Sequence, residues 1–210
     1  MKAEVYFNPY QVAYYEKSGW EAYYDRDWLR AFRLMVALNR EEFHMPLWTA
    51  IAASLDIVRA SVAFAPVDND VPKATAHLQS YFAKVKRMVD IQSDAATLAR
   101  LEMDYWVVHR ELAIERIRQH DLENIDPMVE SLTKLHAALF GISQESARRS
   151  AELRALAAKA VDRITGRYSE SVEKDWQQVE SYLQQAYSAV LSIEAIQTSQ
   201  RASSEGVVHR

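Results

Sequence analysis

The sequence contains no cysteine, and only 4 glycines and 5 prolines occur in its 210 residues. The absence of cysteine excludes disulfide bonds, thiolate zinc sites, iron–sulfur clusters and cysteine nucleophiles. So few glycines exclude a glycine-rich phosphate- or dinucleotide-binding loop, a collagen-like chain and most folds that depend on tight β turns. What remains is a chain suited to long regular elements.

A strong net charge and a long hydrophobic run are also missing. The net charge is −4, from 25 basic and 29 acidic residues, which argues against a surface that grips nucleic acid phosphates. The N-terminus has Glu4 and no apolar run, so it does not read as a signal peptide. No uncharged stretch approaches the length of a membrane span. We therefore expect a cytoplasmic protein that binds neither nucleic acid nor membrane.

The residues that are present predict helices and no strands. Helical spacing of apolar residues is bounded by caps and breakers, and apolar/polar alternation is absent. We predict an all-α, single-domain bundle of about seven helices, mostly antiparallel and up-and-down, over residues 1–196, with a disordered tail over 197–210. The expected helices cover about 9–44, 47–64, 71–89, 94–119, 126–140, 143–166 and 170–196.

Charge and apolar patterning predict how some of these helices pack. Segment 47–64 carries only Asp56 and Arg59, and a helix apolar nearly all round is typical of the centre of a bundle. The basic segment 143–166 and the acidic segment 170–196 are expected to form an antiparallel hairpin. Its predicted packing residues are Val172, Trp176, Val179, Leu183, Tyr187 and Val190, facing the small residues Ala151, Ala155, Ala158 and Ala160.

A single ExxH motif, Glu41-Glu42-Phe43-His44, is the strongest hint of chemistry. Positions i and i+3 share one helix face, so Glu41 and His44 could bind one metal ion together. Four-helix di-iron carboxylate proteins use two such motifs and two further glutamates. The sequence offers one motif, and the alternative is that its residues serve the fold.

A second acid and histidine interrupt an apolar stripe in the segment 94–119. Leu98, Glu102, Tyr105, His109 and Leu112 follow helical spacing, which places two polar groups among core residues. Glu102 and His109 are separated by about 10.5 Å along a helix axis, which makes it hard for them to share one ion. They either belong to a buried polar network or satisfy an arginine or a backbone carbonyl.

Aromatic and charged residues alternate along the first predicted helix. Glu16, Asp27 and Arg30 lie at helical spacing among Tyr and Trp residues, so they are expected to be partly buried. Asp27 and Arg30 could pair along the helix, whereas Glu16 needs a partner from elsewhere. This face is a polar ligand pocket with aromatic walls, an aromatic packing face with buried ion pairs, or an exposed belt for a protein partner.

Two functional hypotheses follow from these patterns. The first is a non-enzymatic helical protein that acts by protein–protein association, as a homo-oligomer or as a subunit or accessory factor of a larger assembly. It rests on the absence of any complete catalytic set and on the aromatic-rich first helix.

The second hypothesis is a metal-carboxylate oxidoreductase or small-ligand enzyme with its site inside the bundle. The sequence resembles ferritin-like bundles at the level of architecture only. The candidate metal ligands are Glu41, His44, Glu102 and His109, with Glu16 bridging, and the metal would be iron or manganese. An arginine filling the space between the acids would favour a structural role instead.

Overall fold

The computed structural model describes residues 6–119 and 123–205, and for residues 192–205 it describes the backbone. These residues form eight helices and no β-strand, so the predicted all-α class is confirmed while the predicted count is one helix short. The helices are α1 (Pro9–Tyr24), α2 (Trp28–Phe43), α3 (Leu47–Phe64), α4 (Val71–Met88), α5 (Ala95–Arg118), α6 (Asp126–Phe140), α7 (Gln144–Thr165) and α8 (Val172–Glu205).

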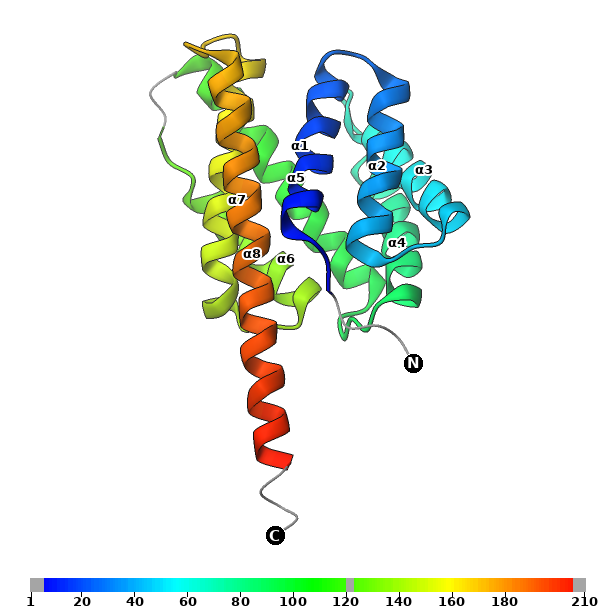
Figure 1. The fold of residues 1–210 in the computed structure, drawn as a ribbon. Helices are drawn as coiled ribbons and strands as arrows, with labels where there is room; N and C mark the ends of the chain where they lie inside the picture. Colours follow the sequence, from blue (N-terminus) through cyan, green and yellow to red (C-terminus); the bar gives the residue numbers. More distant parts are fainter. Residues whose placement is uncertain (1–5, 120–122, 206–210) are drawn as a thin grey trace.

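The eight helices pack as a closed ring. Each helix packs against the next one in sequence, and α8 returns to pack against α1 (Figure 1). The α1–α2 and α3–α4 pairs form one side, α7 and α8 form the other, and the long helix α5 runs behind them (Figure 1). This arrangement turns one face of each helix toward a shared interior.

The extra helix arises because the predicted first helix breaks at residues 25–27. Arg26 adopts the left-handed conformation, with φ of 61°, and Asp27 then caps α2 by accepting a hydrogen bond from the Arg30 backbone N–H at 3.1 Å. The expected partly buried Asp27–Arg30 pair is therefore wrong, since both residues are exposed. The stripe predicted along a continuous helix ends at this turn.

Helix α3 was predicted to lie at the centre of the bundle, and this prediction is wrong. The helix packs mainly on α2 and α4, its Phe64 also contacts Trp106 and Arg110 of α5, and it forms an outer edge of the molecule (Figure 1). Its inner face carries Ala53, Ala60 and Phe64 into the core. By length and composition alone α3 is long and apolar enough to cross a membrane, a test that core helices of soluble proteins also pass. Its buried Asp56 is bound by Lys84 of α4 at 2.5 Å, which fixes α3 to the ring.

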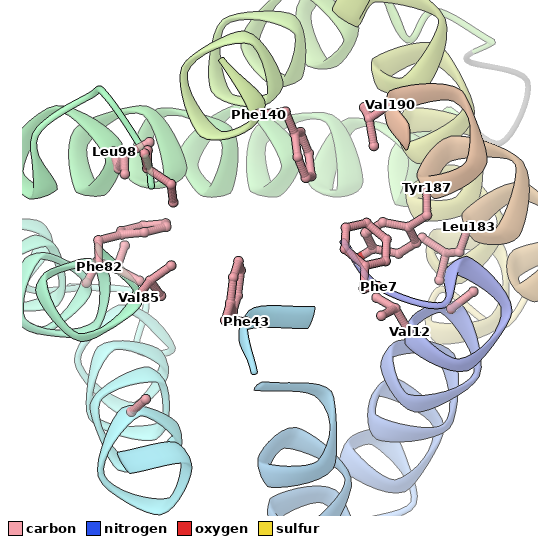
Figure 2. Packing of buried hydrophobic residues seen from close by; sticks show 14 of the residues in the cluster. Phe7, Val12, Phe43, Phe82, Val85, Leu98, Phe140, Leu183, Tyr187 and Val190 are labelled. Carbon is pink, nitrogen blue, oxygen red and sulfur yellow. The ribbon is translucent and has the colours of Figure 1, made fainter. Parts of the chain in front are cut away.

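The hydrophobic core fills the ring between its two sides. Phe7, Val12, Leu183 and Tyr187 gather where α1 meets α8, and Figure 2 shows Phe82, Val85 and Leu98 gathered where α4 meets α5. Phe43 and Phe140 lie between the two groups (Figure 2). The core thus links helices that are not neighbours in the ring.

The predicted α7–α8 hairpin is confirmed. Five of the six residues predicted to pack it are buried, while Val172 is 49% exposed. The four alanines predicted to face them are also buried, but Ala151, Ala155 and Ala158 pack in a separate cluster with α5 and α6, and only Ala160 shares the cluster of the α8 residues. Arg163 of α7 binds Asp175 of α8 at 2.5 Å, as the complementary charges suggested. Helix α8 extends to Glu205, past the predicted end at Ile196, and residues 206–210 lie outside the described part of the chain.

Candidate functional site

A charged cluster lies in the interior of the ring, at the junction of α1, α7 and α8. Arg154 binds both carboxylate oxygens of Glu16, at 2.6 and 3.0 Å, and Tyr187 donates a third hydrogen bond to Glu16 at 2.6 Å. Glu16 is 6% exposed. A bidentate guanidinium–carboxylate pair with a further donor is a strong arrangement in a low-dielectric interior. The predicted burial of Glu16, and its need for a distant partner, are confirmed.

The position of Arg154 follows from a stripe of small residues along α7. Ala147, Ala151, Ala158 and Val161 are buried at helical spacing, and Arg154 continues the same stripe. Because the flanking side chains are short, the long arginine side chain has room to reach into the ring. The guanidinium also lies 5.8 Å from the ring centroid of Trp20 in α1, within range of a cation–π interaction.

Glu42 of α2 points into the same interior. It is 7% exposed, and within the part of the chain that the structure describes its carboxyl group has no hydrogen bond or ion pair. Burial, followed by the charge of Glu16, raises the pKa of Glu42 to about 8, although Arg154 opposes the shift. Glu42 is therefore mostly protonated at neutral pH and titrates near physiological pH.

A third glutamate, Glu102 of α5, completes the group of interior acids. Burial raises its pKa, while Arg154 and a 2.8 Å hydrogen bond from the Trp106 indole N–H partly offset that rise. Tyr81 donates a hydrogen bond to the side chain of Asn39 at 3.0 Å, and burial raises the pKa of Tyr81 well above its ordinary value. The interior thus combines three carboxyl groups, one guanidinium and aromatic rings.

His109, the other predicted polar residue of α5, belongs to a separate cluster. Its Nε2 lies 2.9 Å from Asp162, which also accepts a 2.5 Å hydrogen bond from the fully buried Arg116. The His109 ring stacks on Tyr105 with 5.7 Å between ring centroids. His109 therefore contacts an aspartate, and not the arginine or backbone carbonyl that the structural alternative expected.

The two outer residues of the ExxH motif hold the N-terminal segment. Glu41 accepts a hydrogen bond from the Asn8 backbone N–H at 3.1 Å, and His44 Nε2 lies 2.5 Å from the Tyr6 carbonyl oxygen. His44 ends α2 in the left-handed conformation, with φ of 52°. The motif that suggested a metal ion therefore ties residues 6–8 to the end of α2, while the two residues between Glu41 and His44, Glu42 and Phe43, are buried.

The four predicted metal ligands occupy three places. Glu41 and His44 lie against the N-terminal segment, Glu102 lies in the interior, and His109 pairs with Asp162. Among the residues that the structure describes, no group of three or more histidine, aspartate or glutamate side chains could hold a metal ion. The metal-carboxylate hypothesis stays a prediction without a ligand set in these residues.

Sequence patterns missed the two residues that define the interior site. Glu42 appeared only as a spacer in the ExxH motif, yet it continues the inward stripe of Val36 and Asn39. Arg154 appeared only as one charge of a basic helix, yet it interrupts a stripe of alanines. The usable signal in both cases is a charged residue in register with buried residues. A titratable carboxyl beside a guanidinium can bind a cationic group or exchange a proton near neutral pH.

The second notable feature is on the surface, along the side of α3 that faces away from the ring. We call this side the α3 outer face. Trp48 is 79% exposed, Val62 is 67% exposed and Leu55 is 40% exposed. Its one charged residue is Arg59, which pairs with Asp56 at 3.7 Å. The face comprises Trp48, Ile51, Ala52, Leu55, Val58, Arg59 and Val62, of which Ile51 lies at the edge and also packs in part against the core.

Comparison of the chain with family models, with curated proteins and with solved structures found no match. The function therefore has to be argued from the interior cluster and the α3 outer face.

Proposed function

We propose that this protein acts by protein–protein association, as a subunit or accessory factor of an assembly, and that the α3 outer face is its contact surface. The observation that carries the proposal is the exposure of Trp48, Leu55 and Val62 on one helix face with a single charged neighbour. Contiguous exposed apolar patches mark interaction sites, and the centres of interfaces are depleted in charge and enriched in tryptophan.

The sequence of α3 supports this proposal because its apolar residues exceed what the ring requires. A helix at the edge of a bundle normally carries polar residues on its outer side. In α3 the inner side is already filled by Ala53, Ala60 and Phe64, and the outer side is equally apolar. Covering that outer side with a partner would remove its apolar surface from water.

The experiment exploits the absence of cysteine from the chain. A photoreactive group is attached to a Leu55→Cys variant and activated in cells, and the adducts are identified by mass spectrometry. Ile114→Cys, at a residue 43% exposed on α5, is the matched control. We expect one defined adduct from residue 55 and none from residue 114. Equal labelling from both positions, or no adduct from residue 55, would overturn the proposal.

A second candidate function is the binding of a small cationic ligand in the interior of the ring. The specific observation in its favour is the surplus of acids: Glu16 is paired with Arg154, while Glu42 is buried without a partner in the described residues. An amine would supply the missing positive charge, and nearby aromatic rings such as Trp106 favour cations. Iron or manganese, as in the metal-carboxylate hypothesis, would instead require the predicted ligands Glu41, His44, Glu102 and His109, with Glu16 bridging.

Thermal unfolding separates these ligands. The midpoint is measured for the wild-type chain and for Glu42→Gln with spermidine, with Mn²⁺ and with neither. If the interior binds an amine, spermidine raises the midpoint of the wild-type chain and leaves that of Glu42→Gln unchanged. A rise with Mn²⁺ alone points to metal instead. Equal responses from both proteins would remove the interior from consideration as a ligand site.

A further inference from the structure

The α3 outer face has a projection near one end and a groove near the other. The projection is the indole of Trp48, which is 79% exposed. The groove has a volume of about 420 Å³ and lies where the C-terminal half of α3 meets α4. Its lining combines apolar residues, among them Val62, Ala63 and Pro66, with the polar side chains of Arg59, Asp68, Asp70, Lys73 and His77. This volume is in the range of pockets that hold small organic groups, so it is large enough for an indole.

Leu55 lies midway between the projection and the groove. Trp48, Leu55 and Val62 are spaced by seven residues, and Ile51 and Val58 fall between them, which is the spacing of a helix that packs along another helix. Trp48 and Val62 are therefore about 21 Å apart along the axis. If two copies of α3 pack antiparallel with their Leu55 residues opposite each other, each Trp48 lies opposite the partner's Val62.

We propose that a second copy of this chain covers the α3 outer face, antiparallel about a twofold axis at Leu55, with Trp48 of each copy in the groove of the other. This inference rests on the proposed function and names its partner. A projection and a groove on one face make the surface self-complementary, and a twofold axis closes the contact as a dimer. The exposed tryptophans become the buried anchors of the interface.

Charge favours this arrangement over the alternatives. In a parallel pairing of the same faces, Arg59 would lie opposite the partner's Arg59, and like charges would repel. In the antiparallel pairing, Arg59 lies opposite the partner's Ile51 and within one turn of the partner's Trp48, where a guanidinium can stack on an indole. The groove is lined by Asp68 and Asp70 but also by Arg59 and Lys73, so its formal charges cancel and it has no surplus of positive charge to attract an anionic membrane surface.

Disulfide formation tests the axis directly, because any cysteine introduced is the only one in the chain. We expect Leu55→Cys to oxidise to a cross-linked dimer, since residues on the axis approach within disulfide range. Ile51→Cys and Arg59→Cys are each expected to stay uncross-linked alone, and their equimolar mixture is expected to cross-link. Cross-linking of either variant alone to the same extent as the mixture would exclude the antiparallel axis.

Sedimentation of the purified chain gives the second measurement. We expect a dimer, a dissociation constant raised roughly thirtyfold or more by Trp48→Ala, and a monomer for Leu55→Glu. Ile114→Glu should remain dimeric. A monomer for the wild-type chain, with no cross-link at residue 55, would overturn this inference. If the photoreactive group at residue 55 then labels a different protein, the proposed association stands and only its self-pairing is lost.

Discussion

The interior of the ring contains charged residues and the α3 outer face is apolar, which is the reverse of the usual distribution in a folded protein. The interior holds Glu16, Glu42 and Arg154, whereas the outer face presents Trp48, Leu55 and Val62 to solvent. Charges in a core lower the stability of the fold unless they are paired. Apolar side chains left on the surface contribute no hydrophobic stabilisation, because they are not removed from water. The interior charges find most of their hydrogen-bond partners within the chain, whereas the exposed apolar residues of α3 are not covered by the rest of the ring.

The two regions differ in whether the rest of the chain supplies the contacts that their side chains need. Glu16 receives three hydrogen bonds from within the chain, so its burial is explained by the fold alone. The α3 outer face has no such contacts within the described residues, and we propose that a second molecule covers it. A change in the interior should therefore alter the stability of the chain, and a change on the outer face should alter its association.

The largest effect is expected from Arg154→Met. Removing the guanidinium leaves Glu16 buried without its counter-charge, and breaking one side of a buried pair costs about 3–5 kcal/mol. Urea unfolding measures the loss. The control is Arg148→Met, on the same helix, where the side chain is 62% exposed and the ion pair is superficial. A double variant, Glu16→Gln with Arg154→Met, should recover part of the loss; no recovery would mean that packing dominates.

A change of opposite sign is expected from Glu42→Gln. The folded pKa of Glu42 is about 8, above the ordinary value of 4.5, so between these pH values the unfolded chain releases a proton that the folded chain retains. Stability is thus lost as pH rises from 4.5 to 8. The amide removes this loss and should raise the unfolding free energy at pH 8 by roughly 2–4 kcal/mol.

The pH dependence of this effect distinguishes it from simple repacking. The gain in unfolding free energy from Glu42→Gln should grow between pH 6.5 and 8. Burial lowers the pKa of His136 from 6.5 to about 3, so the effect of His136 on stability falls mainly below this pH range. Glu130→Gln, at a side chain 72% exposed, is the surface control and should change stability by less than about 0.5 kcal/mol. A gain that is constant across this pH range would contradict the assignment of Glu42 as the titrating group.

A smaller loss is expected from Tyr187→Phe. The variant keeps the ring packed against Phe7, with centroids 5.5 Å apart. It removes the 2.6 Å hydrogen bond that the hydroxyl donates to Glu16 and the 3.3 Å hydrogen bond that it accepts from Arg154. Hydrogen bonds to charged groups contribute about 1.5–3 kcal/mol. Tyr10→Phe, at a residue 63% exposed, serves as the control in the same denaturant titration. Equal values for the two variants would show that the hydroxyl of Tyr187 adds nothing.

The smallest effect on the monomer is expected from Leu55→Ala. Measured at dilutions that dissociate any dimer, its unfolding free energy should fall within about 0.5 kcal/mol of the wild-type value. Leu78→Ala removes the same atoms from a residue that is 0% exposed and should cost about 2–5 kcal/mol. Comparable losses would mean that α3 contributes its outer face to the core of a single chain.

Local signals predicted most of the helix boundaries. Asn8 caps α1 by accepting hydrogen bonds from the backbone of Tyr10 and Gln11, and Gly141 ends α6 in the left-handed conformation with φ of 64°. Such signals depend on residues a few positions apart. The break at Arg26 was missed because no glycine or proline marks it, although Asp27 followed by apolar residues is a recognisable cap.

The interior site was only half predictable. The stripes containing Glu16 and Glu102 pointed inward from periodicity alone, but nothing local connects Glu16 with Arg154, which lies 138 residues later. The same limit misplaced α3, because its uniformly apolar composition is equally compatible with a central helix and with an edge helix whose outer side is exposed. Periodicity identifies a face, and tertiary arrangement decides what that face meets.

The long sequence separations around Glu16 also bear on how the chain is made. Its hydrogen-bond partners lie 138 and 171 residues downstream, so α1 leaves the ribosome well before either of them has been synthesised. Until then the Glu16 carboxylate is hydrated, and the side of α1 that carries it cannot be buried without leaving the charge unpaired. Closure of the ring is therefore a late event in biosynthesis, and a chain released before α7 would expose a charged seam for chaperones and proteases.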